Sequence, residues 1–202
     1  ISSNEKCSGK LILSYLDIYG EPKVHLTQPD HISNHPRKHT MHFEEKFYGQ
    51  MWRNAWVQGL DKWEDRGKIF RVTNNIDSGI MFTGTDVWKN YTVTSNISFQ
   101  SVSSGGLVAR VQGLKRYYTF ELCSSNKARI GKMLYDFNTI KEVDFDVDFF
   151  REYKMSLVIN NNKIKGYIDG QLILECEDNH DILDKGGAGF VVSDGTMVSN
   201  EI

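Results

Sequence analysis

Hydrophobic and polar residues alternate along most of the chain from about residue 80 onward, in short stretches separated by Gly, Asn and Asp. Because successive side chains of a strand point to opposite faces of a sheet, this period of two is typical of strands with one buried face. Helical periodicity is nearly absent. The pattern predicts an all-β fold, an antiparallel β-sandwich, with strands at residues 91–97, 107–112, 117–122, 128–134, 143–147, 153–159, 164–168, 172–174 and 190–192.

Two pairs of these strands are separated by turns and are expected to form hairpins. Asp169-Gly170 joins one pair and is typical of a type I′ turn, in which both central residues need positive φ. The other hairpin pairs residues 107–112 with 117–122. One of its faces is expected to join the core and comprises Leu107, Ala109, Val111, Tyr118, Phe120 and Leu122. The opposite face is expected to be polar and comprises Arg110, Gln112, Tyr117, Thr119 and Glu121.

The N-terminal third is less regular, with expected strands at residues 11–16 and 23–26 and a polar loop over 27–50. The sequence contains no repeat and no linker. We therefore expect one domain over residues 1–202, in which residues 1–60 pack on a main sandwich formed by 61–202. The chain begins at Ile1 and ends soon after a strand, so we expect it to be the C-terminal fragment of a longer protein.

Composition and charge narrow the function classes. Hydrophobic residues make up 40% of the chain and the formal net charge is −2, which describes an ordinary globular protein without attraction for nucleic acid or anionic membranes. No apolar run is long enough to span a membrane. The cysteines are odd in number and far apart, which favours a reducing compartment, the cytoplasm: Cys7, Cys123 and Cys176.

Several stretches resemble the C-terminal domain attached to some bacterial ADP-ribosylglycohydrolase-family proteins: residues 11–29, 51–61, 70–72, 84–93 and 106–118. The resemblance implies a concanavalin A-like jelly-roll sandwich of the lectin and glucanase type, similar to laminin G, placed after an all-helical hydrolase domain. That hydrolase domain holds magnesium with clustered Asp and Glu. Its helices and acidic motifs do not occur here, so the resemblance implies a noncatalytic accessory domain with an N-terminal catalytic domain as its partner.

A ligand is expected on the polar face of the 107–122 hairpin. Sandwiches of this class bind sugars where aromatic rings stack on the sugar and polar groups bond its hydroxyls. The predicted ligand is a glycan or an ADP-ribose-type molecule, bound by Arg110, Gln112, Tyr117, Thr119 and Glu121, with Trp88 as a stacking surface. The alternative is a solvated sheet face. Three further tryptophans serve either stacking or packing: Trp52, Trp56 and Trp63.

Other patterns leave alternatives open. Residues 142–148 alternate acidic and apolar residues, as in retaining laminarinase-type hydrolases, but the second Glu of their motif is missing. A structural calcium ion is a possible cofactor there or at Asp178, Asp181 and Asp184. Weaker candidates for a transition metal are His31, His35 and His39. A stand-alone glycoside hydrolase and a purely structural or dimerising module remain the alternative functions.

Overall fold

The structure is a computed structural model that describes residues 56–65, 70–149, 151–200 and 202. The chain divides after Ser33 into two units, and all described residues belong to the second, Asn34–Ile202. The expected strands 11–16 and 23–26, the polar loop 27–50 and Trp52 lie outside the described residues. Their packing against the sandwich stays a prediction.

All regular elements of the described residues are β-strands. They are β1 (Val57–Gly59), β2 (Lys62–Asp65), β3 (Phe70–Thr83), β4 (Tyr91–Ser101), β5 (Ser104–Gly113), β6 (Arg116–Cys123), β7 (Lys127–Leu134), β8 (Asp136–Asp144), β9 (Glu152–Asn160), β10 (Lys163–Ile168), β11 (Gln171–Glu177) and β12 (Gly187–Ser199). The part of the chain that is described holds no helix long and apolar enough to cross a membrane.

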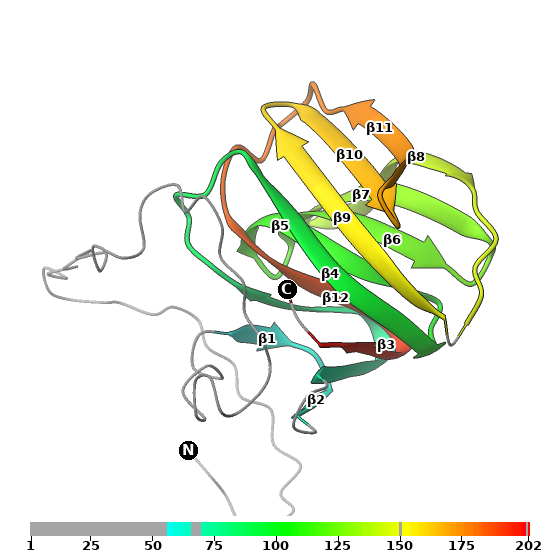
Figure 1. Cartoon of the computed structure of the whole chain (residues 1–202). Coiled ribbons are helices and arrows are strands. Elements are labelled where there is room, and N and C mark those ends of the chain that lie inside the picture. Colours follow the sequence, from blue (N-terminus) through cyan, green and yellow to red (C-terminus); the bar gives the residue numbers. More distant parts are fainter. Residues whose placement is uncertain (1–55, 66–69, 150, 201) are drawn as a thin grey trace, which may run out of the picture. The chain divides into compact units, whose positions relative to one another are not determined.

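The strands form two layers joined through one long strand (Figure 1). One layer contains β4, β9, β10 and β11, and the other contains β5, β6, β7 and β8. The first half of β12 pairs with β5 and its second half with β4, while β3 follows β12 along nearly its whole length. A register shift between Ser193 and Gly195 separates the two halves. Because β12 changes layers there, one hydrogen-bonded path links both halves of the sandwich.

The main core lies between the layers and takes every second residue of each strand. In β9, Tyr153, Met155, Leu157 and Ile159 are fully buried, as the alternation predicts. They pack with Phe120 and other residues of the opposite layer. Burying one such side chain contributes about 1.5–3 kcal/mol, so the interlayer core is the main source of stability.

Most of the predicted strands are confirmed. The Asp169-Gly170 turn has φ of 52° and 82°, as a type I′ turn requires. The predicted strand 143–147 is wrong in its bounds, since β8 ends at Asp144. Beyond that point the chain hydrogen-bonds to Asn126 instead of pairing with β7. The Phe145 amide donates to the Asn126 carbonyl oxygen at 3.0 Å, and the Val147 amide donates to Asn126 Oδ1 at 3.2 Å.

Candidate ligand-binding face

The layer formed by β5 to β8 has an inner face toward the core and an outer face. On β6, Tyr118, Phe120 and Leu122 point into the core cluster. The intervening residues Tyr117 and Thr119 therefore point outward, as does Glu121. Residues directly opposite each other on neighbouring strands share a face, so the outer face also carries Ser104, Val108, Arg129, Gly131, Met133 and Phe137. We call this surface the β5–β8 outer face.

A buried ion pair lies on this face. Arg129 Nη2 donates to Glu121 Oε2 at 2.8 Å, and the Ser104 hydroxyl donates to the same oxygen at 2.6 Å. The Glu121 side chain is 1% exposed and that of Arg129 27%. Burial lowers the pKa of Arg129, but the nearby Glu121 carboxylate more than offsets this and the pKa lies above its ordinary value. The Arg129 guanidinium is therefore charged at neutral pH.

Three polar atoms around this pair have no hydrogen-bond partner within the described residues. They are Glu121 Oε1, Arg129 Nε and Thr119 Oγ1, and all three are buried. Leaving a buried polar group unsatisfied costs about 1–3 kcal/mol. Thr119 and Glu121 are two residues apart on one strand, and Arg129 lies directly opposite Glu121. This concentration of unsatisfied atoms makes the surroundings of the ion pair the candidate site on this face.

An aromatic ring borders the ion pair. The half-buried Phe137 of β8 lies over Gly131, where a Cβ atom would stand 2.3 Å from the ring and 2.9 Å from Thr119 Oγ1. Only glycine leaves space for the ring at this position. The Arg129 guanidinium lies 4.6 Å from the ring centroid of Phe137, which is a cation–π contact. Phe137 thus places an apolar ring surface directly beside a charged pair.

Another part of the outer face, which extends onto β3 and β12, is apolar. A second hydrophobic cluster gathers on it, separate from the interlayer core, and comprises Ile80, Val108, Val111, Tyr117, Met133 and Val191. Burial, together with the Glu121 charge, raises the pKa of Tyr117 to about 12, so its hydroxyl stays protonated. Phe82 and Phe137 are partly buried at the border of the cluster. Polar and apolar groups therefore lie side by side on one sheet face.

The expected position of Arg110 on this face is wrong. Arg110 has φ of 49°, and the register of β5 against β6 shifts between Ala109 and Gly113. This bulge reverses the alternation. The guanidinium instead donates to three acceptors elsewhere: the carbonyl oxygens of Lys89 at 3.0 Å and Leu183 at 2.6 Å, and Asn90 Oδ1 at 3.2 Å. The same shift moves Val111, expected in the main core, into the outer cluster.

The other two expected ligand residues also lie elsewhere. Gln112 is exposed and donates to the Lys185 carbonyl at 3.0 Å, while its Oε1 accepts from Arg116 at 3.3 Å. Trp88 is half-buried and packs edge-on against Tyr91, with ring centroids 6.0 Å apart. Of the expected site, the structure brings together Tyr117, Thr119 and Glu121.

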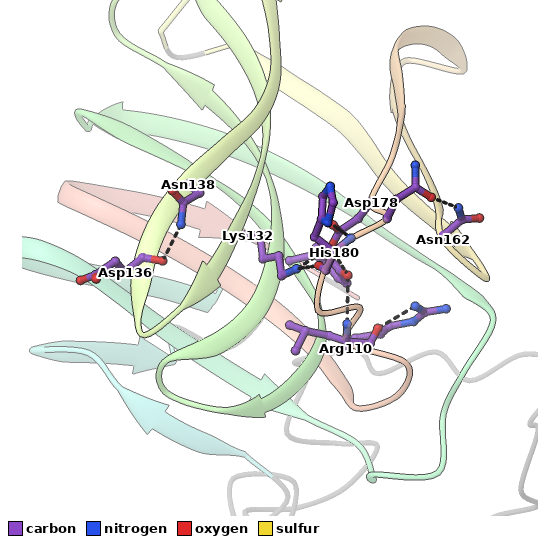
Figure 2. Close-up of polar contacts among 10 residues, drawn as sticks. Arg110, Lys132, Asp136, Asn138, Asn162, Asp178 and His180 are labelled. Atoms are coloured by element: carbon purple, nitrogen blue, oxygen red, sulfur yellow. Dashed lines mark hydrogen bonds and ion pairs between the residues drawn. The ribbon is translucent and has the colours of Figure 1, made fainter.

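A second buried ion pair lies on the inner side of the same strands, at one end of the core (Figure 2). Lys132 Nζ donates to Asp178 Oδ2 at 2.7 Å, and the Tyr118 hydroxyl donates to the same oxygen at 2.7 Å. The His180 amide donates to Asp178 Oδ1 at 3.2 Å, and Lys132 also bonds the His180 carbonyl. The Leu183 amide donates to the Tyr118 hydroxyl at 3.0 Å. Every group is paired, so the network anchors the loop between β11 and β12.

The sequence interpretation missed Arg129, Phe137, Ser104 and the Lys132–Asp178 pair. Lys132 had a readable signal, because it occupies an inward position of an alternating strand. Arg129 had a weaker one, its opposite charge across from Glu121, which depends on the register of β6 and β7. Phe137 carried no signal, because its role follows from packing on Gly131.

Metal candidates find no support in the described part of the chain. There, no group of three or more His, Cys, Asp or Glu side chains could hold a metal ion. Asp178, a calcium candidate, is bound to Lys132 and Tyr118. His31, His35 and His39 lie outside the described residues. Both metal hypotheses stay predictions.

No protein-family model matches the sequence, and no curated protein is found as a relative. The fold is similar to that of the carbohydrate-binding module CBM66 from Bacillus subtilis, with a TM-score of 0.66, 18% identity, and coverage of 72% of this chain and 92% of that one. A Bacillus subtilis protein of unknown function with a galectin-like fold matches with a TM-score of 0.57 and 12% identity, over 74% of this chain and 90% of that one.

The GH43 protein BlXynB from Bacillus licheniformis matches with a TM-score of 0.61 and 14% identity, over 82% of this chain and 39% of that one. None of these three links the chain to ADP-ribosylglycohydrolase proteins. Likeness at such low identity establishes the fold. The predicted class, an antiparallel β-sandwich of the lectin type, is confirmed.

Proposed function

We propose that this domain is a noncatalytic carbohydrate-binding module whose ligand lies on the β5–β8 outer face. The observation that carries the proposal is the concentration of unsatisfied buried polar atoms on Thr119, Glu121 and Arg129, beside the ring of Phe137. Carbohydrates offer both hydroxyl groups and apolar CH surfaces, so they fit a site that combines polar atoms with an aromatic ring. The name of CBM66, a structure with a similar fold, describes a carbohydrate-binding module and supports this choice.

A hydrolytic function is less well supported. Retaining and inverting glycosidases need two carboxyl groups about 5–9.5 Å apart on either side of the scissile bond. Among the described residues, the buried carboxyls are those of Glu121 and Asp178. Glu121 lies on the outer face, whereas Asp178 bonds Tyr118 and Lys132 on the inner face of the same strands. They cannot approach one bond together, and each already neutralises a cation.

A second part of the proposal concerns the longer protein to which this domain would belong. The sequence resemblance supports attachment to an ADP-ribosylglycohydrolase-like catalytic domain, and on this basis the module supports that domain or holds it near a glycan or an ADP-ribose-type ligand. The resemblance alone carries this part. Binding by the isolated chain does not depend on it, so the two parts are tested separately.

The direct test is binding of the full chain to a glycan array that includes ADP-ribose, followed by calorimetric titration of each compound retained. We expect at least one saturable ligand, and at least a tenfold loss of affinity in Arg129→Ala. Lys127→Ala is the matched control, because Lys127 lies two residues away on the same strand and pairs with the exposed Asp144 at 2.6 Å. Its affinity should stay within twofold of the wild type.

Two results would count against the proposal. One is an array on which nothing binds. The other is a ligand whose affinity is equally insensitive to Arg129→Ala and Lys127→Ala, which would place the binding surface elsewhere on the molecule.

A further inference from the structure

The unsatisfied atoms on the β5–β8 outer face define what kind of group can satisfy them. Glu121 Oε1 belongs to a carboxylate paired with a guanidinium, and a carboxylate oxygen accepts hydrogen bonds only. Arg129 Nε donates only. Thr119 Oγ1 does either. A matching ligand must therefore present one donor and one acceptor at the same time.

The covalent structure of the ion pair brings these two requirements close together. Glu121 Oε1 shares its carbon with Oε2, and Arg129 Nε shares its carbon with Nη2, and Oε2 and Nη2 are in contact at 2.8 Å. The free acceptor and the free donor thus belong to one ion pair. Adjacent hydroxyl groups on neighbouring ring carbons suit this arrangement, because one donates to Oε1 while the next accepts from Nε.

Charge restricts the ligand further. The ion pair has no net charge, and both partners are largely withdrawn from water. A ligand carboxylate or phosphate could accept from Arg129 Nε, but it would be repelled by Glu121 at close range in a poorly solvated site. A ligand amine could donate to Glu121 but would be repelled by Arg129. Only a neutral group avoids both penalties.

We propose, resting on the carbohydrate-binding function above, that the Glu121–Arg129 pair selects a neutral sugar with two adjacent free hydroxyls and rejects sugars charged at the same ring. In the structure the Phe137 ring lies over Gly131 beside Thr119. The three unsatisfied atoms are buried, so a sugar would reach the pair only if this ring turned aside, and its apolar side would then pack on the ring. Thr119 bonds whichever hydroxyl lies nearest.

The ligand specificity is tested by saturation-transfer NMR and titration of the full 202-residue chain. The neutral probes are the methyl glycosides of glucose, galactose, mannose and ribose. The charged probes are methyl glucuronide and methyl galacturonide, and methyl 3-deoxyglucoside retains no two adjacent ring hydroxyls. We expect at least one neutral glycoside to bind about tenfold or more tightly than its uronide. If glucoside binds, the 3-deoxy compound should lose binding by a similar factor.

Glu121→Gln tests the role of the acceptor. It removes the negative charge and places an amide next to Arg129, so neutral binding should fall more than about tenfold, the loss expected for a hydrogen bond to a charged group. The uronide should gain affinity, because the site is now positive. Glu142→Gln is the matched control: it makes the same change opposite Arg129 on β8, but its side chain is 51% exposed. It should alter neither preference.

Thr119→Val is a second variant, chosen because it is expected to fold as stably as the wild type, so that a loss of affinity cannot be due to misfolding. It removes a buried hydroxyl that is unsatisfied within the described residues, so thermal stability should be unchanged or higher while sugar affinity falls about threefold to tenfold. A uronide that binds as tightly as its neutral parent, or a Thr119→Val variant with unchanged affinity, overturns the diol proposal and leaves carbohydrate binding standing. If no carbohydrate binds at all, the proposed function itself is wrong.

Discussion

Two buried ion pairs flank the same pair of strands, β6 and β7, from opposite sides, and they differ in how completely they are satisfied. On the inner side, both oxygens of Asp178 accept hydrogen bonds, from Lys132, Tyr118 and the His180 amide. On the outer side, Glu121 uses one oxygen, and its other oxygen has no partner in the described structure.

The difference separates a structural role from a binding role. A buried pair with every group bonded holds its elements in place and has nothing left to offer a ligand. A buried pair with free donors and acceptors destabilises the unliganded fold unless something binds there. Polar residues in alternating positions of a strand thus do not reveal their role. The number of unused hydrogen-bonding groups does.

The largest effect is expected where the inner pair is broken. Asp178→Ala leaves the Lys132 ammonium buried without its counterion and removes the acceptor of Tyr118. Breaking a buried pair in this way lowers the free energy of unfolding by about 3–5 kcal/mol, and urea denaturation should show this loss. The combination Lys132→Met with Asp178→Ala should recover at least half of it. A single variant that loses less than about 1 kcal/mol would contradict the anchoring role.

A smaller loss is expected from the outer pair. Glu121→Ala leaves Arg129, whose side chain is 27% exposed and can turn to water, whereas Lys132 is 9% exposed. We expect Glu121→Ala to lower the free energy of unfolding by about 1–2 kcal/mol in the same urea experiment and to abolish ligand binding. A loss equal to that of Asp178→Ala would show that the outer pair is also a structural anchor.

The sequence predicted this contrast only in part. The alternation in residues 117–122 assigned Tyr117, Thr119 and Glu121 to one face and Tyr118 and Phe120 to the other, and the register confirms it. Alternation is a local property of an extended chain, so a single sequence shows it clearly. Burial of the outward residues depends on what covers the sheet, and the pattern carries no information on that point.

Features that depend on non-local contacts escaped prediction. Arg110 takes a left-handed conformation, which sequence reasoning expects at Gly or Asn, and the structure stabilises it by bonding the guanidinium to Lys89, Asn90 and Leu183. The bulge at this point reversed the expected faces of the last residues of β5. Phe137 reaches the site only because its ring lies over Gly131 of β7, which has no side chain to block it. Arg110 depends on acceptors 21 and 73 residues away, and Phe137 on a register shift in the β7–β8 hairpin that local alternation does not reveal.

The two pairs should also differ in their response to acid. Burial alone would raise the pKa of Asp178, but hydrogen bonds from Lys132, Tyr118 and His180 outweigh it, so the pKa lies below its usual value near 3.8. The contribution of the ionised Asp178 carboxylate to the free energy of unfolding is therefore complete above that usual value, and it is lost as the pH falls through the lower folded-state pKa. The stability difference between the wild type and Asp178→Asn should be constant from pH 7 to about 5 and should narrow below about 4. A gap that stays constant down to pH 2 would contradict this assignment.

The smallest effect is expected at the exposed ion pairs of the opposite layer. Lys165 Nζ lies 3.1 Å from Glu175 Oε1, but the side chains are 34% and 41% exposed. Water replaces such a contact well, so Lys165→Ala should lose less than about 0.5 kcal/mol, and ligand affinity should not change. Lys163→Ala, which breaks the more exposed pair with Glu177, with side chains 55% and 49% exposed, serves as a second variant of the same kind. Losses above about 1 kcal/mol in both would mean that distance, and not withdrawal from water, governs these pairs, and would weaken the distinction between the two buried ones.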